Sequence, residues 1–507
     1  MNSIRIVAVD QFKKKFLICS GVAFVIYVVY KYSRKKTPYI LPGSLPILGH
    51  SLFNKTALIF DTIKHSRFTG YGLSVFRIPF LDVHVISSFY AIRELFLKKG
   101  STSKTRHPRT RMLIHRRNDE CGGILAANGS VWHHNRKLVF NFLRSLDKDS
   151  QLDSPSRVEK CIFEEAHRLR DRLINEDFID AQMLLTKSVA NLIIQLIYGR
   201  VFDYEDDEFC EVVKSILRFS ALSGGFSDLI TKLSKYIPIF RRFNEIQKCS
   251  DCIDRFITKY NVLHLHDDKE TILNVTTSSG LFDDEELIMK NNYFMVRDMF
   301  LAGTETTAST MYWAVLLLGL NPKVVEEARK ELKSKALDFN SLRVSDVLNR
   351  LPYCRAVVYE IQRFGCVATG SLSHILDRGI HVDGDEFFPR SFDLNKGSFL
   401  LYNIQCNLFD PNVWSYAQEF NPQNFLQSKD DGSIEFVCPE QFIPFGIGPR
   451  VCAGRKLAVA ELCVYILMII TSFDIEIENP DPQQRLQRLF GVTSLPCNYK
   501  AKFHLIN

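Results

Sequence analysis

One cysteine near the C-terminus stands where a thiolate could do chemistry. Cys452 lies in the glycine-rich segment Phe445 to Gly454, FGIGPRVCAG, just before a helical run that starts at Leu457. Backbone N–H groups at such a place can point at the sulfur and favour its thiolate. Gly448 and Gly454 can let a flat ligand approach the backbone closely. A lone thiolate with open space beyond it is the ligation of haem iron in oxygen-activating proteins. The alternative, a zinc site, needs three or four ligands, and none lie nearby in sequence.

The same segment carries a family pattern. Residues Phe445 to Gly454 match Phe-x-x-Gly-x-Arg-x-Cys-x-Gly at all five fixed positions, and a chance match in a chain of this composition is on the order of 1 in 10,000. Here the sequence resembles the cytochrome P-450 family, the haem-thiolate monooxygenases, in its animal microsomal type. The resemblance implies haem b, iron protoporphyrin IX, as the cofactor and Cys452 as the axial metal ligand. Phe445 can pack beside the sulfur, and Arg450 can meet a carboxylate.

A second group of chemical side chains lies in the segment AGTETT, residues Ala302 to Thr307. Threonine hydroxyls can bond back to the preceding turn and open a helix, and a widened turn would make a pocket for oxygen and water. Glu305 and Thr306 are then an acid and an alcohol beside that pocket, suited to relaying protons. Alone, the segment also fits an ordinary buried helix. In the family it is the distal oxygen-activation motif, so the resemblance assigns Thr306 and Glu305 to catalysis and Ala302 and Gly303 to the cofactor pocket.

Several side chains could hold the carboxylates of a haem. Trp132 and Arg136 are four residues apart, which places both on one face of a helix. An indole N–H and a guanidinium there can bind a propionate, although a core tryptophan beside a solvated arginine is the ordinary interpretation. The family's Trp-x-x-x-Arg helix favours the propionate role. By the same resemblance, His374 and Arg450 are further propionate ligands, with Ser373 in place of the usual preceding proline.

Glu360 and Arg363 place opposite charges three residues apart on one helical face. Such a pair can be a surface ion pair worth a few tenths of a kcal/mol. The resemblance implies instead the family's buried Glu-x-x-Arg pair. The usual third partner is an arginine, but the corresponding segment here reads Asn421-Pro422-Gln423-Asn424-Phe425. Because Asn424 replaces the arginine, the sequence supports the pair and not a three-way ion network.

A long central helix has to position the segment at Ala302. Acids at residues 283–286 suit a helix N-terminus, the apolar-rich pattern runs to Gly319, and Asn321-Pro322 ends it. That helix has about 36 residues and a length of about 54 Å. Further predicted elements are helices at Val158–Leu173, Ala181–Ile197 and Leu457–Thr471 and strands at Leu73–Ile78, Val83–Ile86 and Ser398–Tyr402. The predicted fold class is mainly α with small β-sheets, and the resemblance implies a cytochrome P-450 fold whose long central helix crosses over the haem.

The N-terminus predicts a membrane anchor. Residues Phe16 to Tyr30 carry no charge and are flanked by lysines and arginines, which can snorkel to extend a helix of about 23 Å. A cleaved signal peptide would need a small-residue cleavage site, whereas the sequence continues Tyr-Lys-Tyr-Ser-Arg-Lys-Lys. We therefore divide the chain into one transmembrane anchor at 1–36, a Pro-rich neck at 37–50 and a single catalytic domain at 51–507. The charges on the two sides tie, so they do not decide orientation.

Composition excludes several classes of protein. The chain has 507 residues, 46% apolar and 24% charged, which is ordinary globular usage. A net charge of +7 over this length does not argue for nucleic acid, and no glycine-rich dinucleotide fingerprint occurs. The 13 cysteines are an odd number, which favours a reducing compartment and leaves at least one thiol free.

The resemblance implies a membrane-bound monooxygenase that inserts one atom of O2 into a lipophilic xenobiotic, steroid or fatty acid. Electrons would come from an NADPH-cytochrome P-450 reductase, with a b-type cytochrome as a second candidate donor. The implied location is the endoplasmic reticulum membrane, single-pass, with the catalytic domain on the cytosolic side. Two alternatives stay open: a haem-thiolate isomerase or dehydratase, against which Thr306 argues, and a non-catalytic membrane haem protein.

Overall fold

The computed structural model describes residues 41, 69–78, 81–98, 105–106, 122–148, 156–174, 177–223, 241–264, 271–278, 280–481 and 486–506. The predicted anchor lies outside these residues, as do most of the Pro-rich neck and most of the segment from Phe226 to Phe243. Within the described ranges, none of the helices has the length and apolar character needed to span a membrane.

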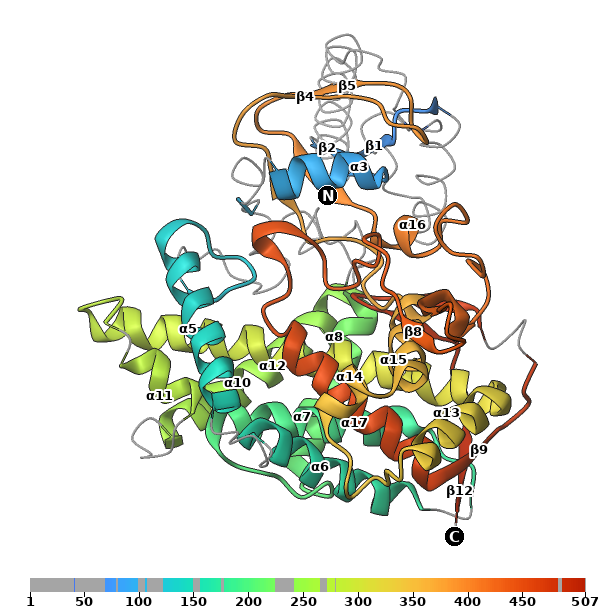
Figure 1. Cartoon of the computed structure of the whole chain (residues 1–507). Coiled ribbons are helices and arrows are strands. Elements are labelled where there is room, and N and C mark those ends of the chain that lie inside the picture. Colours follow the sequence, from blue (N-terminus) through green and yellow to red (C-terminus); the bar gives the residue numbers. More distant parts are fainter. Residues whose placement is uncertain are drawn as a thin grey trace, which may run out of the picture.

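Helices make up most of the described chain, as predicted (Figure 1). They are α3 (Phe89–Arg93), α5 (Gly129–Lys148), α6 (Arg157–Leu173), α7 (Ala181–Tyr198), α8 (Asp207–Leu222), α10 (Arg241–His264), α11 (Ile272–Thr277), α12 (Glu285–Leu320), α13 (Pro322–Ser334), α14 (Val344–Asn349), α15 (Pro352–Gly365), α16 (Ile404–Leu408) and α17 (Arg455–Ser472). The predicted helices at 158–173, 181–197 and 457–471 correspond to α6, α7 and α17.

The predicted long helix is α12, which has 36 residues. The Asp284 side chain caps it by accepting from the N–H groups of Glu286 and Leu287, at 2.8 and 3.2 Å. At the other end, Asn321 is the C-cap and Pro322 opens α13, because proline fits the first turn of a helix but cannot continue one. The helix runs through the middle of the helical part of the molecule (Figure 1).

The strands form small sheets. They are β1 (Leu73–Ile78), β2 (Leu81–Ile86), β3 (His374–Ile375), β4 (Ile380–Val382), β5 (Phe392–Leu394), β6 (Phe399–Tyr402), β7 (Leu426–Ser428), β8 (Ile434–Phe436), β9 (Phe473–Ile477), β10 (Arg488–Phe490), β11 (Ser494–Pro496) and β12 (Ala501–Leu505). The largest sheet has the order β1-β2-β6-β3, in which β2 and β6 are parallel and the other pairs antiparallel. It brings the N-terminal strands next to residues more than 300 positions later, and β3 thereby places His374.

The core surrounds the second half of α12. Residues 307–318 of this helix are all buried, and α12 packs against α7, α17 and α15. Most residues of this stretch are apolar, and they are not confined to one face of the helix. This is the pattern of a helix enclosed by other helices. The functional segment at 302–307 sits at the edge of this enclosed stretch, where Ala302, Gly303 and Thr306 keep partial exposure.

Candidate functional site

Cys452 lies in a turn that leads into α17. A short 3-10 turn at residues 448–450 precedes it, and the Cys452 N–H donates to the Phe445 carbonyl at 3.0 Å. The Gly454 N–H is hydrogen-bonded to the sulfur. A Cβ built on Gly454 would meet no heavy atom within 4 Å. The sulfur is therefore held by the backbone of its own loop beside an open space of the kind that a flat ligand needs.

Two effects oppose each other at the Cys452 thiol. Burial raises its pKa, while the Gly454 N–H and the cations Arg136 and Arg455 lower it, and burial is the larger effect. The side chain nevertheless has exposed surface. The two observations are compatible because many protein atoms surround the loop while part of the residue stays exposed. A metal cation at the sulfur would favour the thiolate, as it does for coordinating thiols in general.

Gly448 has a different role from the one predicted. Its φ is +81°, and a Cβ on it would lie 2.0 Å from the Phe96 carbonyl oxygen. Glycine is required at this position because the loop passes directly over the backbone of another segment. The close approach that the sequence assigns to a flat ligand is, at Gly448, an approach to the protein itself. Phe445 is partly buried, and the Arg455 guanidinium lies 5.8 Å from the centre of its ring.

Arg450 joins the cysteine loop to the segment before α5. Its guanidinium donates to the carbonyls of Ile124 and Ala127, at 3.1 and 2.7 Å, and to Asn128 Oδ1 at 2.9 Å. It also lies 4.0 Å from the centre of the Trp132 ring. Burial, together with the nearby cations Arg106 and Arg136, lowers the pKa of Arg450 to about 8.

A second buried arginine, which the sequence analysis did not identify, stands beside His374. Arg106 Nη1 donates to the carbonyls of Leu372 and Ser373 and lies 2.8 Å from His374 Nε2. Because a guanidinium can only donate, Nε2 is the acceptor and the imidazole is neutral. Burial is the main cause that lowers the pKa of Arg106 to about 10. His374 is itself buried, in T-shaped contact with Phe96.

Three arginines, Arg106, Arg136 and Arg450, form a cluster of positive charge. Arg136 donates to the Val451 carbonyl at 2.6 Å, and within the described ranges neither Arg106 nor Arg136 forms an ion pair with a carboxylate. Trp132 Nε1 and Arg106 Nε are buried and have no hydrogen-bond partner among those residues. Buried donors and mutually repelling guanidiniums are costly unless an anion joins them. The donor set therefore fits the two carboxylates of a haem, next to a cysteine.

The segment at 302–307 lies on α12 and does not open the helix. The Thr306 hydroxyl donates to the Ala302 carbonyl at 2.7 Å, which is the predicted bond to the preceding turn. The helix nevertheless stays α-helical from 285 to 320, so the predicted widened turn is not observed. A carbonyl oxygen has two lone pairs, so it can accept from the hydroxyl and keep its backbone bond. Gly303 packs against α7, since a Cβ on it would lie 2.8 Å from Ile193 Cδ1.

Glu305 points to a different set of partners. Its Oε1 accepts from the hydroxyls of Ser220, Ser309 and Thr493, and the carboxyl group is buried. Burial raises its pKa, and these three hydroxyls lower it by a smaller amount. The hydrogen bonds of Glu305 and Thr306 therefore lead in different directions, as expected for adjacent positions on a helix.

Comparisons with known proteins agree with this arrangement. Residues 41–503 match the family model for Cytochrome P450. The chain belongs to the cytochrome P450 family. It is 28% identical to Cytochrome P450 2D20 of Mesocricetus auratus over 494 residues, covering 93% of each chain. It is 27% identical to Cytochrome P450 2U1 of Homo sapiens over 436 residues (82% of this chain, 75% of that protein), and 27% identical to Cytochrome P450 2J5 of Mus musculus over 515 residues (96% and 95%).

Membership confirms the predicted family and its animal microsomal type. This cytochrome P450 is an oxidoreductase, a monooxygenase that incorporates molecular oxygen, and the family's cofactor is haem b with a cysteine thiolate as axial ligand. The predicted mainly helical fold with small sheets is confirmed as well.

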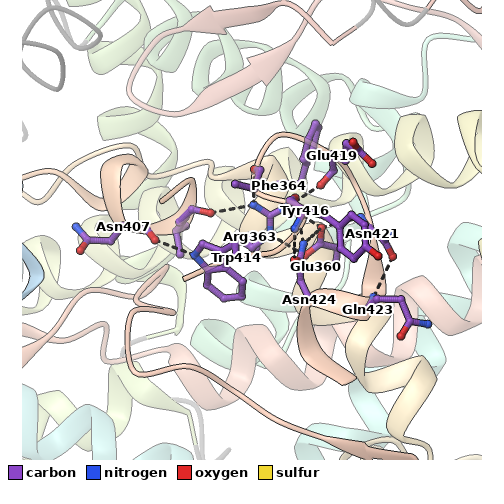
Figure 2. Close-up of polar contacts among 12 residues, drawn as sticks. Glu360, Arg363, Phe364, Asn407, Trp414, Tyr416, Glu419, Asn421, Gln423 and Asn424 are labelled. Carbon is purple, nitrogen blue, oxygen red and sulfur yellow. Dashed lines mark hydrogen bonds and ion pairs between the residues drawn. The ribbon is translucent and has the colours of Figure 1, made fainter. Parts of the chain in front are cut away.

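In this cytochrome P450, Glu360 and Arg363 form a fully buried pair (Figure 2). Two parallel hydrogen bonds of 2.7 Å join them, from Arg363 Nε and Nη2 to the two carboxylate oxygens. The surface ion pair considered above is therefore excluded. Asn424 takes the third position as a neutral donor, with its Nδ2 3.1 Å from Glu360 Oε1, and the Asn421 N–H donates to the same oxygen at 2.8 Å.

Sequence reasoning missed Arg106 and Asn128. Arg106 lies in a stretch with several arginines, and nothing local separates it from the others. Its partners Leu372 to His374 are 266 to 268 residues away in sequence. Asn128 Oδ1 accepts from the Arg106 N–H at 2.7 Å as well as from Arg450. Only the fold brings Arg106, Asn128 and Arg450 together.

Proposed function

We propose that this P450 monooxygenase inserts one oxygen atom from O2 into a lipophilic small molecule, a xenobiotic, steroid or fatty acid, with Cys452 as the axial thiolate. The observation that carries the proposal is the cluster of buried Arg106 and Trp132 and partly buried Arg136 beside the Cys452 loop. It offers unpaired donors and positive charge where a haem would need its propionates bound, and an accessible sulfur where the iron would need its ligand.

The residues of the site have separate proposed roles. The propionates are bound by five side chains: Trp132, Arg106, Arg136, His374 and Arg450. Binding them offsets the repulsion among the three arginines. The charge of two carboxylates offsets the cluster, so cofactor binding and folding of this region are coupled. Phe445 lies at the start of the cysteine loop, and its carbonyl fixes the Cys452 N–H at 3.0 Å. When bound, the haem supplies the activation of O2.

Residues of α12 are proposed to line the cofactor pocket and to handle protons there. Ala302 is small and partly exposed, Gly303 allows close packing of α12 against α7, and Thr306 is partly exposed with its hydroxyl oxygen able to accept a further hydrogen bond. We assign proton handling to Thr306 and to Glu305. The hydroxyl holds a proton at Oγ1, and the buried carboxyl, whose pKa is raised by burial, can store one.

We infer the electron donor from surface charge and the membrane location from the N-terminal sequence. Lys137, Arg455 and Lys456 are exposed near the Cys452 loop, and this basic face suits an acidic electron donor. We assign that role to an NADPH-cytochrome P-450 reductase, with a b-type cytochrome as a second donor.

Residues 1–36 are proposed to anchor the chain in the endoplasmic reticulum membrane, residues 37–50 to form the neck, and residues 51–507 to form one cytosolic catalytic domain. No nucleic acid is involved.

The test is a pair of cysteine variants in the full-length chain. Cys452→Ala should abolish the red-shifted absorption of the reduced carbon monoxide complex, whereas Cys438→Ala, at another exposed cysteine, should keep it. With reductase present, the wild type should consume NADPH and O2 in a substrate-dependent way. An unchanged spectrum in Cys452→Ala would overturn the ligand assignment. Turnover that persists without O2 or NADPH would favour an isomerase or dehydratase instead.

A further inference from the structure

Glu305 is the centre of a buried hydroxyl cluster that the proposed proton-handling role does not explain. The cluster consists of Glu305, Ser220, Ser309 and Thr493. Ser220 Oγ donates to Glu305 Oε1 at 2.6 Å, Ser309 Oγ donates to the same oxygen at 3.2 Å, and the Thr493 hydroxyl also donates to it. The hydroxyl oxygens of Ser309 and Thr493 are 3.3 Å apart. All four residues are buried.

The donors come from three different elements. Ser220 lies in the last turn of α8, Ser309 lies one turn after Glu305 on α12, and Thr493 lies in the turn between β10 and β11. No arginine, lysine or histidine among the described residues contacts the Glu305 carboxyl group. The carboxyl group is therefore held by hydroxyl donors alone, and its Oε1 atom joins α12 to α8 and to the β10–β11 turn.

The backbone around the cluster is built for the same contact. The Val492 N–H donates to the Ser220 carbonyl at 2.9 Å. A Cβ on Gly491 would lie 2.5 Å from the Ser220 carbonyl oxygen, so only glycine lets the turn approach α8 this closely. Val492, between Gly491 and Thr493, is apolar and 53% exposed. The cluster thus fixes the place of an exposed apolar side chain one residue away.

We propose that Glu305 is a positioning residue for substrate specificity: through Ser220 and Thr493 it holds the end of α8 and the β10–β11 turn against α12. These elements then keep a fixed spacing beside Thr306, and that spacing selects which lipophilic molecules fit and which of their atoms faces Thr306. The inference rests on the proposed function, because it takes the substrate to bind on the Thr306 side of α12. It goes beyond proton handling, since the Oε1 atom is committed to hydroxyls of other elements.

The variants that test this leave Glu305 intact. Thr493→Val removes the hydroxyl and keeps the branched shape, and Thr493→Ser keeps the hydroxyl as the matched control. Ser220→Ala removes the α8 donor independently. The probes are 4-phenylimidazole and imidazole, which bind haem iron through the same ring nitrogen and differ in an apolar group that extends into the pocket. Dissociation constants come from spectral titration of the haem-loaded enzyme, and hydrogen–deuterium exchange is followed in residues 488–496.

A lost hydrogen bond to a carboxylate corresponds to a factor of about ten or more. In Thr493→Val we therefore expect exchange in residues 488–496 to be about tenfold faster and 4-phenylimidazole to bind several-fold more weakly, with imidazole binding unchanged. Thr493→Ser should match the wild type, and Ser220→Ala should resemble Thr493→Val. Unchanged exchange and unchanged binding ratios in both hydroxyl-deleted variants would overturn the proposal, as would equal weakening of both probes.

The result of this experiment does not depend on the result of the Cys452→Ala test. Exchange in residues 488–496 needs neither turnover nor any assignment of Cys452, so a failed ligand assignment would leave it readable. If Thr493→Val changes only the NADPH consumed per product, with exchange and both dissociation constants at wild-type values, then the cluster serves proton handling alone and the positioning role is wrong.

Discussion

Glu461 offers the most direct test of the electrostatics of this core. It lies on α17 with 1% of its surface exposed, and its hydrogen-bond partner is Thr307 on α12. Its Oε2 has no partner among the described residues. Burial without a cation raises the pKa of this carboxyl from 4.5 to about 8. The folded protein therefore keeps a proton on Glu461 at neutral pH that the unfolded chain releases.

The sign of the effect on stability follows from this proton. Between pH 4.5 and 8 the folded state binds more protons at Glu461 than the unfolded state, so stability falls as pH rises. The slope is about 1.4 kcal/mol per pH unit, which gives about 4 kcal/mol between pH 5 and pH 8. Glu461→Gln has nearly the same shape and does not ionise. It should match the wild type at pH 5 and be more stable by about 4 kcal/mol at pH 8.

Thermal unfolding of the haem-loaded full-length chain can measure this difference. At about 2.1 cal/mol/K per residue, 507 residues give an unfolding entropy of about 1.1 kcal/mol/K, so about 4 kcal/mol corresponds to about 4 °C in Tm. Thermal unfolding is followed by circular dichroism at pH 5.5, 7 and 8, at one scan rate. The difference in Tm between Glu461→Gln and the wild type should increase with pH. Glu386→Gln, at an exposed carboxyl, is the control and should show no widening.

Two results would refute the reasoning on Glu461. A stability difference that does not change with pH would mean that the folded and unfolded states titrate alike at this position. A Gln variant that is less stable than the wild type at pH 8 would mean that Glu461 is ionised in the folded protein and that its charge is stabilising. Either result would contradict a carboxyl held neutral by burial.

Three further predictions concern the loops of the site. Asn424→Ala should cost about 1–3 kcal/mol in urea unfolding, because it removes an amide donor from the buried Glu360 carboxylate, and Asn424→Asp should cost more because it sets two carboxylates against each other. Gly448→Ala should lose haem, read from the ratio of haem to protein absorbance, while Gly397→Ala, with the same φ of +81° but no neighbour within 4 Å, should retain it. Arg106→Gln should speed haem transfer to apomyoglobin several-fold, and equal transfer rates would remove Arg106 from the propionate site.

Sequence alone predicted the elements whose signals are local. The bounds of α12 follow from an acidic cap at Asp284 and from Asn321-Pro322, and the structure places both ends there. The pair Glu360 and Arg363 could be predicted for a similar reason, since both partners lie on one turn of one helix. The neutral role of Asn424 also followed, because the residue type at that position is visible without the fold.

Long-range contacts could not be predicted from the sequence. Gly448 shows why: the sequence indicated a glycine that needs space, but only the fold reveals that the nearest atom belongs to Phe96. The Glu305 cluster is a further case, since Thr493 is 188 residues away and an isolated threonine in a turn carries no signal. The prediction of a widened turn was wrong for a local reason. The Thr306 hydroxyl bonds to the Ala302 carbonyl in addition to the backbone hydrogen bonds of the helix, and it does not break them.

The arginines explain how loops without regular structure are fixed around this site. Arg363 donates to four backbone carbonyls besides Glu360, and Arg450 and Arg106 each donate to two. Loop carbonyls have no helix or strand partner, so they need donors from elsewhere, and one planar guanidinium can supply several at once. Lysine has three donors on a single atom and cannot span carbonyls that far apart. Replacing any of these arginines by lysine keeps the charge but should release a loop, so geometry rather than charge accounts for arginine at these positions.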